Sequence, residues 1–249
     1  MAILLTKDLR KHFDGFYAVN KLTINFEQGY ITGIIGPNGS GKSTLVNVLS
    51  GLIPFEGGEV IISGETLVKI HSYQTLSFGM TRTFQEVRLF EQMSVIDNIL
   101  VVLTDRRIGK SFFEKHTSFH LEKAESSLKK VGLWEKKDEL AKNLSYGQRK
   151  LLEIARVTAL DHNGISDLKI VLFDEPFAGL FPEMVKIVLS AIQELREQGK
   201  AVVLIEHNME LIRMLSDYLY VLDSGELLAE GKPKDVLSRA DVIEAYLGE

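Results

Sequence analysis

The chain has 249 residues, of which 45% are hydrophobic and 25% are charged, and its formal net charge is -5. This composition is ordinary for a globular protein, and the length suits one large domain or a core with a smaller lobe. The negative charge argues against general nucleic-acid binding, because proteins that bind the phosphate backbone usually carry a basic excess. The sequence has no cysteine, which excludes disulfides and thiolate metal sites.

The sequence gives no indication of an exported or membrane-spanning segment. The N-terminus has no basic stretch followed by a long apolar core, so we expect no secretory signal. Apolar runs such as residues 201–205 are far shorter than the roughly 20 residues that a helix needs to cross a bilayer. We therefore expect the protein to reach a membrane only by docking to another protein.

The N-terminal part of the sequence predicts a small antiparallel sheet. Residues 22–26 alternate between apolar and polar side chains, which is typical of a half-buried strand, and a second strand is predicted at residues 60–62. Phe13 precedes a turn and is a candidate ring for stacking on adenine. Its spacing alone favours a place in the core of the sheet.

Residues 36–43 match G-x-x-x-x-G-K-[ST], the pattern of a phosphate-binding loop. An apolar strand is predicted before the loop, at residues 30–35, and a helix after it, with apolar side chains at Leu45, Val48, Leu49 and Leu52. Glycines let the backbone curl so that its N–H groups point at phosphate oxygens, and the helix adds the positive end of its dipole. The sequence therefore predicts nucleoside triphosphate binding, by Gly36, Pro37, Asn38, Gly39, Ser40, Gly41, Lys42, Ser43 and Thr44.

Within this loop two side chains have distinct predicted roles. Lys42 can reach the β- and γ-phosphates, and the hydroxyl of Ser43 can ligate Mg²⁺.

The middle of the chain, from about residue 93 to residue 142, is charged and helical in pattern. A capping-box pattern at residues 94–97 opens one predicted helix, with a buried face at Ile99, Leu100 and Leu103. A second amphipathic helix is predicted from Leu121, Ala124, Leu128 and Val131. Between them, residues 105–118 mix basic and aromatic side chains. A nucleic-acid patch is one interpretation, but the acidic chain favours an exposed connecting loop.

The last third of the chain alternates strands with helices. Predicted strands at residues 169–173 and 201–205 are almost continuously apolar, which indicates a parallel sheet covered on both faces. The helix between them has its predicted buried face at Val185, Val188, Leu189, Ile192 and Leu195. A hairpin at residues 218–228 and a short terminal helix complete the pattern.

Two carboxylates follow the predicted strand at residues 169–173. Asp174 stands where a carboxylate beside a phosphate loop would hold Mg²⁺, and Glu175 is a candidate general base for the attacking water. An acid at the end of a strand, taken alone, is usually a solvated loop residue. The phosphate loop in the same chain favours the metal and base roles.

His207 and Gln85 complete the predicted catalytic set. His207 follows the next strand at the same edge, where ligands collect in open parallel sheets, and a neutral imidazole there can hydrogen-bond the γ-phosphate or the water. Gln85 can touch the metal and the water through its amide, although its spacing alone fits an exposed loop. We therefore predict Glu175, His207 and Gln85 as catalytic residues. The predicted metal ligands are Ser43, Gln85 and Asp174.

Residues 144–148 open another predicted helix and present a hydroxyl, a flexible backbone and a helix N-terminus. Such an arrangement is a second potential anion site. Because the phosphate loop already surrounds its own nucleotide, this second site suggests a γ-phosphate supplied by another subunit. The alternative, an ordinary capped helix, stays open on this pattern alone.

Together these elements resemble the ATP-binding cassette (ABC) ATPases over essentially the whole chain. In chain order, the family's Walker A loop, Q-loop glutamine, signature motif, Walker B strand with catalytic glutamate, and switch histidine match residues 36–43, Gln85, residues 144–148, residues 170–175 and His207. The resemblance implies that Ser145, Tyr146, Gly147 and Gln148 contact the ATP of the opposite subunit. In that family a ring at the position of Phe13 stacks on adenine, so the resemblance favours this role over a place in the core.

Residues 79–90, 147–156 and 242–249 are similar to the ATPase subunits of branched-chain amino acid importers. This resemblance implies ATP and Mg²⁺ as cofactors and a homo- or heterodimer of ATPases bound beneath transmembrane permeases. It also implies a place on the cytoplasmic side of the inner or plasma membrane, an extracytoplasmic substrate-binding protein as an indirect partner, and no nucleic acid. The subgroup extends to urea importers and a lipopolysaccharide-export ATPase.

Three features depart from the family pattern. Tyr146 stands where many members have a glycine, whereas Ser145 and Gly147 remain. Phe181 stands where the family usually carries Asp or Asn in the loop that crosses the dimer, so a hydrogen-bonding side chain is replaced there. Residues 161–168 resemble a small insertion before the Walker B strand.

The expected fold is α/β: a P-loop NTPase with a RecA-like parallel sheet core, an N-terminal antiparallel β subdomain and an inserted α-helical subdomain. We expect one ABC ATPase domain over residues 1–249, with the core at residues 1–85 and 160–249 and the helical subdomain at about residues 86–159. The expected function is ATP hydrolysis for a membrane transporter of branched-chain or related amino acids. The alternatives are an ATPase of the urea or lipopolysaccharide type, a soluble iron-sulfur assembly ATPase, or a small-molecule phosphotransferase, which has no use for residues 144–148.

Overall fold

The computed structural model describes residues 2–103, 118–160 and 168–247. Two predicted features therefore lie outside the described residues, apart from one residue each: the basic-aromatic stretch at 105–118 and the insertion at 161–168. The chain forms two compact units. Unit 1 comprises Met1–Arg82, Leu168–Glu175 and Gln193–Glu249, and unit 2 comprises Thr83–Asp167 and Pro176–Ile192.

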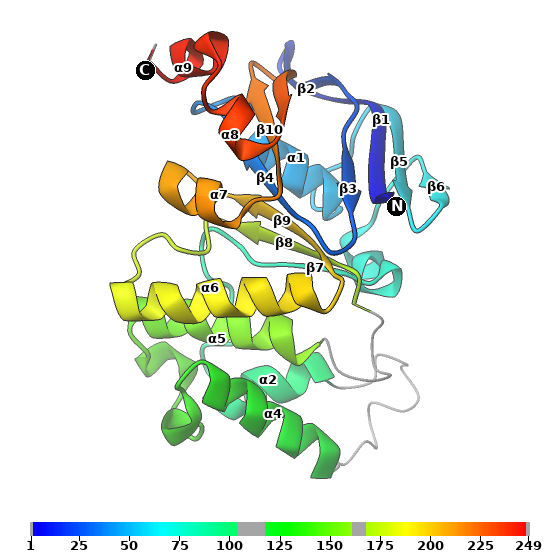
Figure 1. Ribbon diagram of the computed structural model, residues 1–249. Helices are drawn as coiled ribbons and strands as arrows, with labels where there is room; N and C mark the ends of the chain where they lie inside the picture. Colours follow the sequence, from blue (N-terminus) through cyan, green and yellow to red (C-terminus); the bar gives the residue numbers. More distant parts are fainter. Residues whose placement is uncertain (1, 104–117, 161–167, 248–249) are drawn as a thin grey trace. The chain divides into compact units, whose positions relative to one another are not determined.

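The centre of unit 1 is a six-stranded sheet with the order β11-β10-β4-β9-β8-β7 (Figure 1). Its strands are β4 (Ile31–Ile35), β7 (Met80–Arg82), β8 (Ile170–Asp174), β9 (Ala201–Ile205), β10 (Tyr218–Asp223) and β11 (Glu226–Gly231). The pairs from β10 to β7 are parallel, and β11 joins the edge as the antiparallel arm of a hairpin. All five residues of β4, β8 and β9 are buried, as expected for central parallel strands.

A second, antiparallel sheet in unit 1 has the order β2-β1-β5-β6, with β3 also paired to β1. Its strands are β1 (Ala2–Phe13), β2 (Phe16–Leu22), β3 (Asn25–Glu27), β5 (Gly57–Ile62) and β6 (Glu65–Leu67). The long strand β1 was not predicted. At residues 22–26 the predicted alternation is confirmed, since Leu22, Ile24 and Phe26 are buried, but the single strand is wrong, because the chain leaves one strand at Leu22 and enters the next at Asn25.

The side chain of Thr6 explains this break. Its Oγ1 donates to the carbonyl of Leu22 at 2.9 Å and accepts from the N–H of Ile24 at 3.1 Å. These bonds satisfy the backbone groups of Leu22 and Ile24 where the strand is interrupted. The chain therefore pairs with the second half of β1 through β2 and with its first half through β3.

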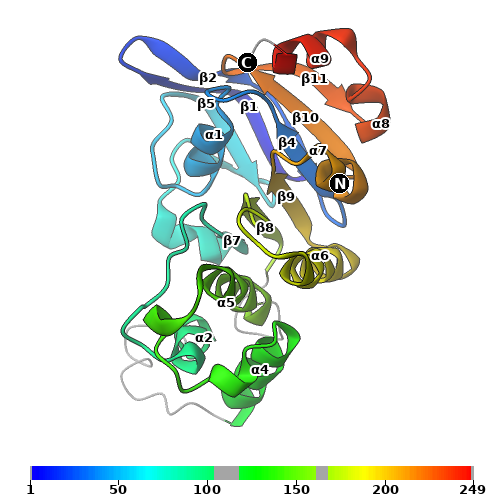
Figure 2. The same ribbon diagram turned by 90° about the vertical axis from the view of Figure 1, so that its left-hand side faces the viewer.

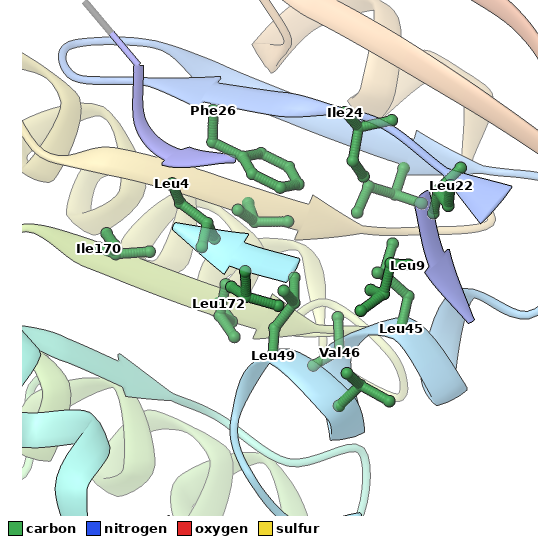
Figure 3. Close-up of a cluster of buried hydrophobic side chains, with 14 of the residues drawn as sticks. Leu4, Leu9, Leu22, Ile24, Phe26, Leu45, Val46, Leu49, Ile170 and Leu172 are labelled. Carbon is green, nitrogen blue, oxygen red and sulfur yellow. The ribbon is translucent and has the colours of Figure 1, made fainter. Parts of the chain in front are cut away.

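The hydrophobic core of unit 1 lies between the two sheets and helix α1 (Lys42–Leu49). Figure 3 shows Leu4 and Phe26 of the antiparallel sheet, Leu45 and Leu49 of α1, and Leu172 of β8 converging on it. These side chains are at most 1% exposed. Burial of this kind gives about 1.5–3 kcal/mol for each large apolar side chain, and it fixes the loop that connects β4 to α1.

The remaining helices of unit 1 are short. They are η1 (Ser72–Phe78), α7 (Met209–Leu215), α8 (Pro233–Val236) and α9 (Ala240–Leu247). Ile212 of α7 lies against Gly33 of β4. The predicted helix after the phosphate loop ends earlier than the pattern suggested. It ends at Leu49, and Gly51 just beyond takes the left-handed conformation with a φ angle of 67°, as the predicted stop at this glycine requires, so Leu52 lies beyond the helix and is 40% exposed.

Unit 2 is helical, with α2 (Val95–Leu103), α4 (Ser118–Lys130), α5 (Tyr146–Ala159), η2 (Trp134–Lys136) and η3 (Ala141–Asn143). Helix α6 (Pro182–Glu197) begins in unit 2 and ends in unit 1. Figure 2 shows α2, α4 and α5 side by side, and each of them contacts the other two. The predicted face of α2 is confirmed, since Ile99, Leu100 and Leu103 are buried.

The predicted faces of two other helices need correction. Leu121 of α4 is 44% exposed, because the buried stripe of that helix runs through His120, Ala124 and Leu128 instead. On α6, Val188, Ile192 and Leu195 are buried as predicted, whereas Val185 and Leu189 are only half-buried.

Candidate functional site

The carboxyl ends of three neighbouring strands in unit 1 bring the predicted residues to one edge of the sheet. Strand β9 lies between β4 and β8, and Ile205 pairs with Ile34 on one side and Asp174 on the other (Figure 2). The segments that leave these strands begin at Gly36, Glu175 and Glu206. Ligands bind at this edge in open parallel sheets.

The loop from residue 36 to residue 41 curls sharply between β4 and α1. Gly36, Gly39 and Gly41 have φ angles of 151°, 77° and 100°. A Cβ atom on Gly41 would lie 2.1 Å from the carbonyl oxygen of Ala18, so only glycine fits this position. Helix α1 begins directly afterwards at Lys42. The first N–H groups of a helix have no acceptor within it, so those of α1 can bind a ligand together with the loop.

The ammonium group of Lys42 is folded onto the loop. Its Nζ donates to the carbonyls of Gly36 at 2.7 Å and Pro37 at 2.8 Å, and it lies 3.3 Å from Oγ of Ser40. A lysine, curled main-chain N–H groups and a helix N-terminus form a donor set that fits a phosphate group. Asn38, Gly39 and Ser43 of this loop are exposed, and Thr44 is half-buried.

Asp174, the last residue of β8, is held by an arginine. Its Oδ2 accepts from Nη2 of Arg82 at 3.0 Å, and the two side chains are 5% and 8% exposed. Nη1 of Arg82 also donates to Oδ1 of Asn47 and to Oγ of Ser50, each at 2.8 Å. Arg82 thus ties the end of α1 to the carboxylate. A carboxylate and the hydroxyl of Ser43 supply oxygen ligands of the kind that Mg²⁺ prefers.

Glu175 and His207 meet at the carboxyl edge. Nε2 of His207 lies 3.1 Å from Oε1 of Glu175, and the side chains are 47% and 18% exposed, respectively. Glu175 has a φ angle of 49°, which is the left-handed conformation, and its N–H donates to the carbonyl of Ile205 at 3.0 Å. A non-glycine residue held in this region stores strain, and such residues gather at functional sites.

Gln85 belongs to unit 2 and is exposed, three residues after the end of β7. Its neighbour Phe84 donates its backbone N–H to Oε1 of Glu153 on α5, at 3.1 Å. Glu153 is 5% exposed, and burial raises its pKa from 4.5 to about 7, against the opposing effect of its hydrogen bonds and nearby cations. Sequence reasoning gave Gln85 a role but did not find this anchor.

Ser145 caps α5 in unit 2. Its Oγ accepts from the N–H of Gln148 at 3.4 Å, while Oε1 of Gln148 accepts from the N–H of Ser145 at 3.0 Å. This reciprocal capping box leaves the first turn of the helix, with its positive dipole end, at the predicted anion site.

The predicted departures at Tyr146 and Phe181 lie near the same helix end. Gly147 packs closely against Met184, since a Cβ there would lie 2.5 Å from Sδ of Met184 and would have to displace that side chain. The ring of Tyr146 lies beside Gly179 in the loop that precedes α6, and it is 52% exposed. Phe181, in that loop, is 71% exposed. Tyr146 therefore lies outside the core and contacts the loop that contains Phe181.

Phe13 is not a core residue. It ends strand β1, pairs with Phe16 across a turn, and is 47% exposed, which contradicts the placement that its spacing alone favoured. Nζ of Lys11 lies 4.7 Å from the centre of its ring.

Three polar side chains at or near these elements were not predicted: Arg82, Glu153 and Arg156. Glu153 and Arg156 had a signal in the sequence, because each is a charged residue among the apolar residues of one predicted helix, whereas Arg82 had none. Glu153 in particular follows Leu151 and Leu152 on a helix whose next residues are also apolar.

Within the ranges that the structure describes, none of the helices combines the length and apolar character needed to cross a bilayer.

Comparison with known proteins identifies the family of this chain. The ABC transporter family matches residues 19–178, and a second family, the branched-chain amino acid ATP-binding cassette transporter, matches residues 226–249. The chain is 36% identical to the high-affinity branched-chain amino acid transport ATP-binding protein LivG of Salmonella typhimurium, over 99% of this chain and 98% of that protein. It is 35% identical to the corresponding protein BraF of Pseudomonas aeruginosa, with the same coverage of both chains.

Solved structures agree with the sequence comparison. A nucleotide-free ATP-binding cassette from an ABC transporter has a TM-score of 0.85 and 32% identity, with full coverage of both chains. An ATP-binding cassette of an ABC transporter in its ADP conformation has a TM-score of 0.84 and 33% identity, again with full coverage of both chains. The predicted P-loop NTPase fold is confirmed. The chain belongs to the ATP-binding cassette family and is an ATP-hydrolysing subunit of an ABC transporter.

Proposed function

We propose that this chain energises the import of branched-chain amino acids, as one of two ATPase subunits bound to transmembrane permeases on the cytoplasmic side of the membrane. The match of residues 226–249 to the branched-chain amino acid family supports the cargo, together with relatives that carry the same function in their names. The observation that carries the proposed hydrolysis is the contact between Glu175 and His207, at the sheet edge where the phosphate-binding loop also begins.

In this proposal the loop residues from Gly36 to Thr44 bind the phosphates of ATP. The ammonium group of Lys42 donates to two loop carbonyls, and in the proposal phosphate oxygens replace these as its acceptors. Phe13, with about half of its surface exposed, stacks on the adenine ring.

Ser43, Asp174 and Gln85 are the residues that would hold Mg²⁺, which supplies positive charge to the phosphate oxygens when it is bound. Arg82 holds the Asp174 carboxylate in place in the interior through the ion pair at 3.0 Å.

Glu175 acts as the general base. Its carboxylate accepts a proton from the water that attacks the γ-phosphate, and His207 orients the carboxylate through the bond to Oε1. His207 also hydrogen-bonds the γ-phosphate in this proposal, so release of the phosphate changes the contacts of His207, which orients the base Glu175.

The signature residues Ser145, Tyr146, Gly147 and Gln148 contact the ATP of a second subunit. The exposed hydroxyl of Ser145 and the N-terminus of α5, with the positive end of its dipole, supply the anion-binding groups. Phe181 provides a large exposed apolar side chain for the same face, in place of a hydrogen-bonding one.

Two measurements test this proposal. Uptake of labelled leucine is compared in a host strain that lacks the chain and in the same strain carrying the wild type or Glu175→Gln. We expect uptake to be lost and then restored by the wild type alone, with urea uptake unchanged. Unchanged leucine uptake in the deleted strain would contradict the proposed cargo.

The second measurement identifies the partners. Tagged Glu175→Gln is purified from solubilised membranes with ATP and Mg²⁺, and the proteins that accompany it are identified by mass spectrometry. We expect two transmembrane permease subunits. A soluble scaffold in their place would contradict the transport complex.

A further inference from the structure

The segment around Gln85 is fastened to helix α5 at two points. Oε1 of Glu153 accepts from the N–H of Phe84 at 3.1 Å, and Nη1 of Arg156 donates to the carbonyl of Arg88 at 2.6 Å. Glu153 and Arg156 stand three positions apart on α5, so they project from the same side of the helix. Gln85 lies between the two anchored residues in the sequence.

Burying the carboxyl group of Glu153 is unfavourable, and its hydrogen bonds to backbone N–H groups offset part of that free energy. Glu153 is 5% exposed, on a stretch of helix in which its neighbours Leu152, Ile154 and Ala155 are buried as well. Burial raises its pKa to about 7, whereas backbone hydrogen bonds from Phe84 and Arg88 favour the ionised form. A buried carboxyl that serves backbone N–H groups holds its segment firmly, because an apolar residue would leave those groups without an acceptor.

Ring contacts stiffen the same segment. The guanidinium of Arg88 lies 4.2 Å from the centre of the Phe84 ring, and that of Arg156 lies 5.5 Å from the Phe90 ring. Beyond these contacts, Asn98 of α2 accepts from the N–H of Phe90 at 2.9 Å and donates to its carbonyl at 3.1 Å. The backbone on both sides of Gln85 is therefore fixed within unit 2.

Helix α5 carries a second predicted ATP contact at its start. Ser145 caps the helix and leads the signature residues, and Glu153 follows about two turns later. We propose that Glu153 and Arg156 are positioning residues for Gln85: they fix the Gln85 segment to the helix that begins with the signature residues, so that Gln85 and Ser145 move as one body. This inference rests on the proposed role of Gln85 in hydrolysis.

The first test measures the fastening without nucleotide. Hydrogen exchange of a peptide covering residues 80–90, in which the Phe84 amide keeps its label, is followed by mass spectrometry in Glu153→Ala, Glu153→Gln and Thr158→Val. Thr158 is a matched control, because it lies on the same helix, is 9% exposed, and bonds through its hydroxyl to the carbonyl of Ala155 within that helix.

We expect Glu153→Ala to speed exchange of the Phe84 amide by about tenfold, since this amide loses its acceptor. Glu153→Gln keeps an oxygen acceptor and is expected to restore slow exchange. Thr158→Val should behave as the wild type. Equal exchange in Glu153→Ala and the wild type would overturn the proposed fastening.

The second test is a double-mutant cycle on ATP hydrolysis with Gln85→Ala. Glu153→Ala is expected to lower kcat by about tenfold with the KM for ATP nearly unchanged, because a displaced catalytic group affects the transition state rather than binding. In the Gln85→Ala background the same substitution should lower kcat by less than about twofold, since the residue that it positions is absent.

The outcomes separate this inference from the proposed function. If Gln85→Ala lowers kcat but Glu153→Ala lowers it by the same factor in both backgrounds, Glu153 has only a structural role and the inference is wrong. If Gln85→Ala leaves kcat unchanged, the proposed role of Gln85 fails, and the inference fails with it. Arg156→Lys keeps the positive charge but lacks the guanidinium group that reaches the carbonyl of Arg88. Its kcat is expected to lie between those of the wild type and Arg156→Ala.

Discussion

Nε2 of His207 lies 3.1 Å from Oε1 of Glu175, and Glu175 itself has a left-handed backbone with a φ angle of 49°. The contact joins the ends of two neighbouring strands, β8 and β9. The strained backbone turns the carboxylate side chain away from the course of the strand, where a histidine can reach it. A proposed base whose orientation is fixed both by strain and by a hydrogen bond is preorganised for proton transfer.

The strain at Glu175 predicts a stability difference between two inactive variants. Glu175→Gly and Glu175→Ala both remove the carboxylate, but only alanine keeps a Cβ in the left-handed region. We expect the glycine variant to be more stable by about 1 kcal/mol in urea denaturation. Equal midpoints for the two variants would show that the backbone relaxes and that no strain is stored.

The buried pair of Arg82 and Asp174 predicts a coupled effect. Arg82→Met removes the ion partner of the Asp174 carboxylate, which is 5% exposed. We therefore expect the free energy of unfolding, measured by thermal denaturation, to fall by about 3–5 kcal/mol. The double variant Arg82→Met with Asp174→Asn should be less destabilised than Arg82→Met alone, because no buried charge remains. If the two substitutions simply add, the ion pair has no such role.

Glu153 predicts a dependence of stability on pH. Its pKa in the folded chain, about 7, lies above the value of 4.5 for the free side chain. The folded state therefore holds the proton more tightly, so this group's contribution is fully present below about pH 4.5 and is lost as the pH rises to about 7, by about 3 kcal/mol in total. Lys150 and Arg156, the nearby cations, oppose the shift.

The check is a comparison of the wild type with Glu153→Gln by urea denaturation between pH 4.5 and 7.5. The difference in unfolding free energy should move in favour of the variant as the pH rises. A difference that stays constant over this range would contradict the raised pKa of Glu153.

Phe13 predicts a change in nucleotide affinity without a change in stability. Phe13→Ala should weaken ATP binding by about 1–3 kcal/mol, because a base loses its stacking surface, and Phe13→Trp should retain binding. Phe16→Ala is the matched control, since Phe16 pairs with Phe13 across the turn and is 81% exposed. Equal losses for the alanine variants at both positions would mean that Phe13 has no specific stacking role.

The sequence was sufficient for the elements whose signal is local. The phosphate-binding pattern at residues 36–43 spans the loop after β4 and the first residues of α1 as predicted, and Asp174, Glu175 and His207 lie at one edge of the sheet. Continuous apolar runs identify central parallel strands, and the order of parallel strands then places their carboxyl ends together. For these residues a pattern of neighbours in the chain determines position.

The contacts that the sequence did not predict join residues far apart in the chain. Arg82 and Asp174 are 92 positions apart, and Phe84 and Glu153 are 69 positions apart. Helical periodicity places Glu153 on a buried face but says nothing of the backbone amide that it meets. The left-handed backbone of Glu175 has no signal either, because only the surrounding structure holds a glutamate in that conformation.

The central claim is that Glu175 is the base for ATP hydrolysis, and its most direct test is the rate of phosphate release from ATP and Mg²⁺ by the purified chain. Glu175→Gln keeps the size and hydrogen-bonding capacity of the side chain but cannot take the proton. We expect its rate to fall by at least about 100-fold, with ATP binding retained, while the control Glu210→Gln, an exposed acid on α7, keeps the wild-type rate. A Glu175→Gln variant that releases phosphate at the wild-type rate would contradict the account.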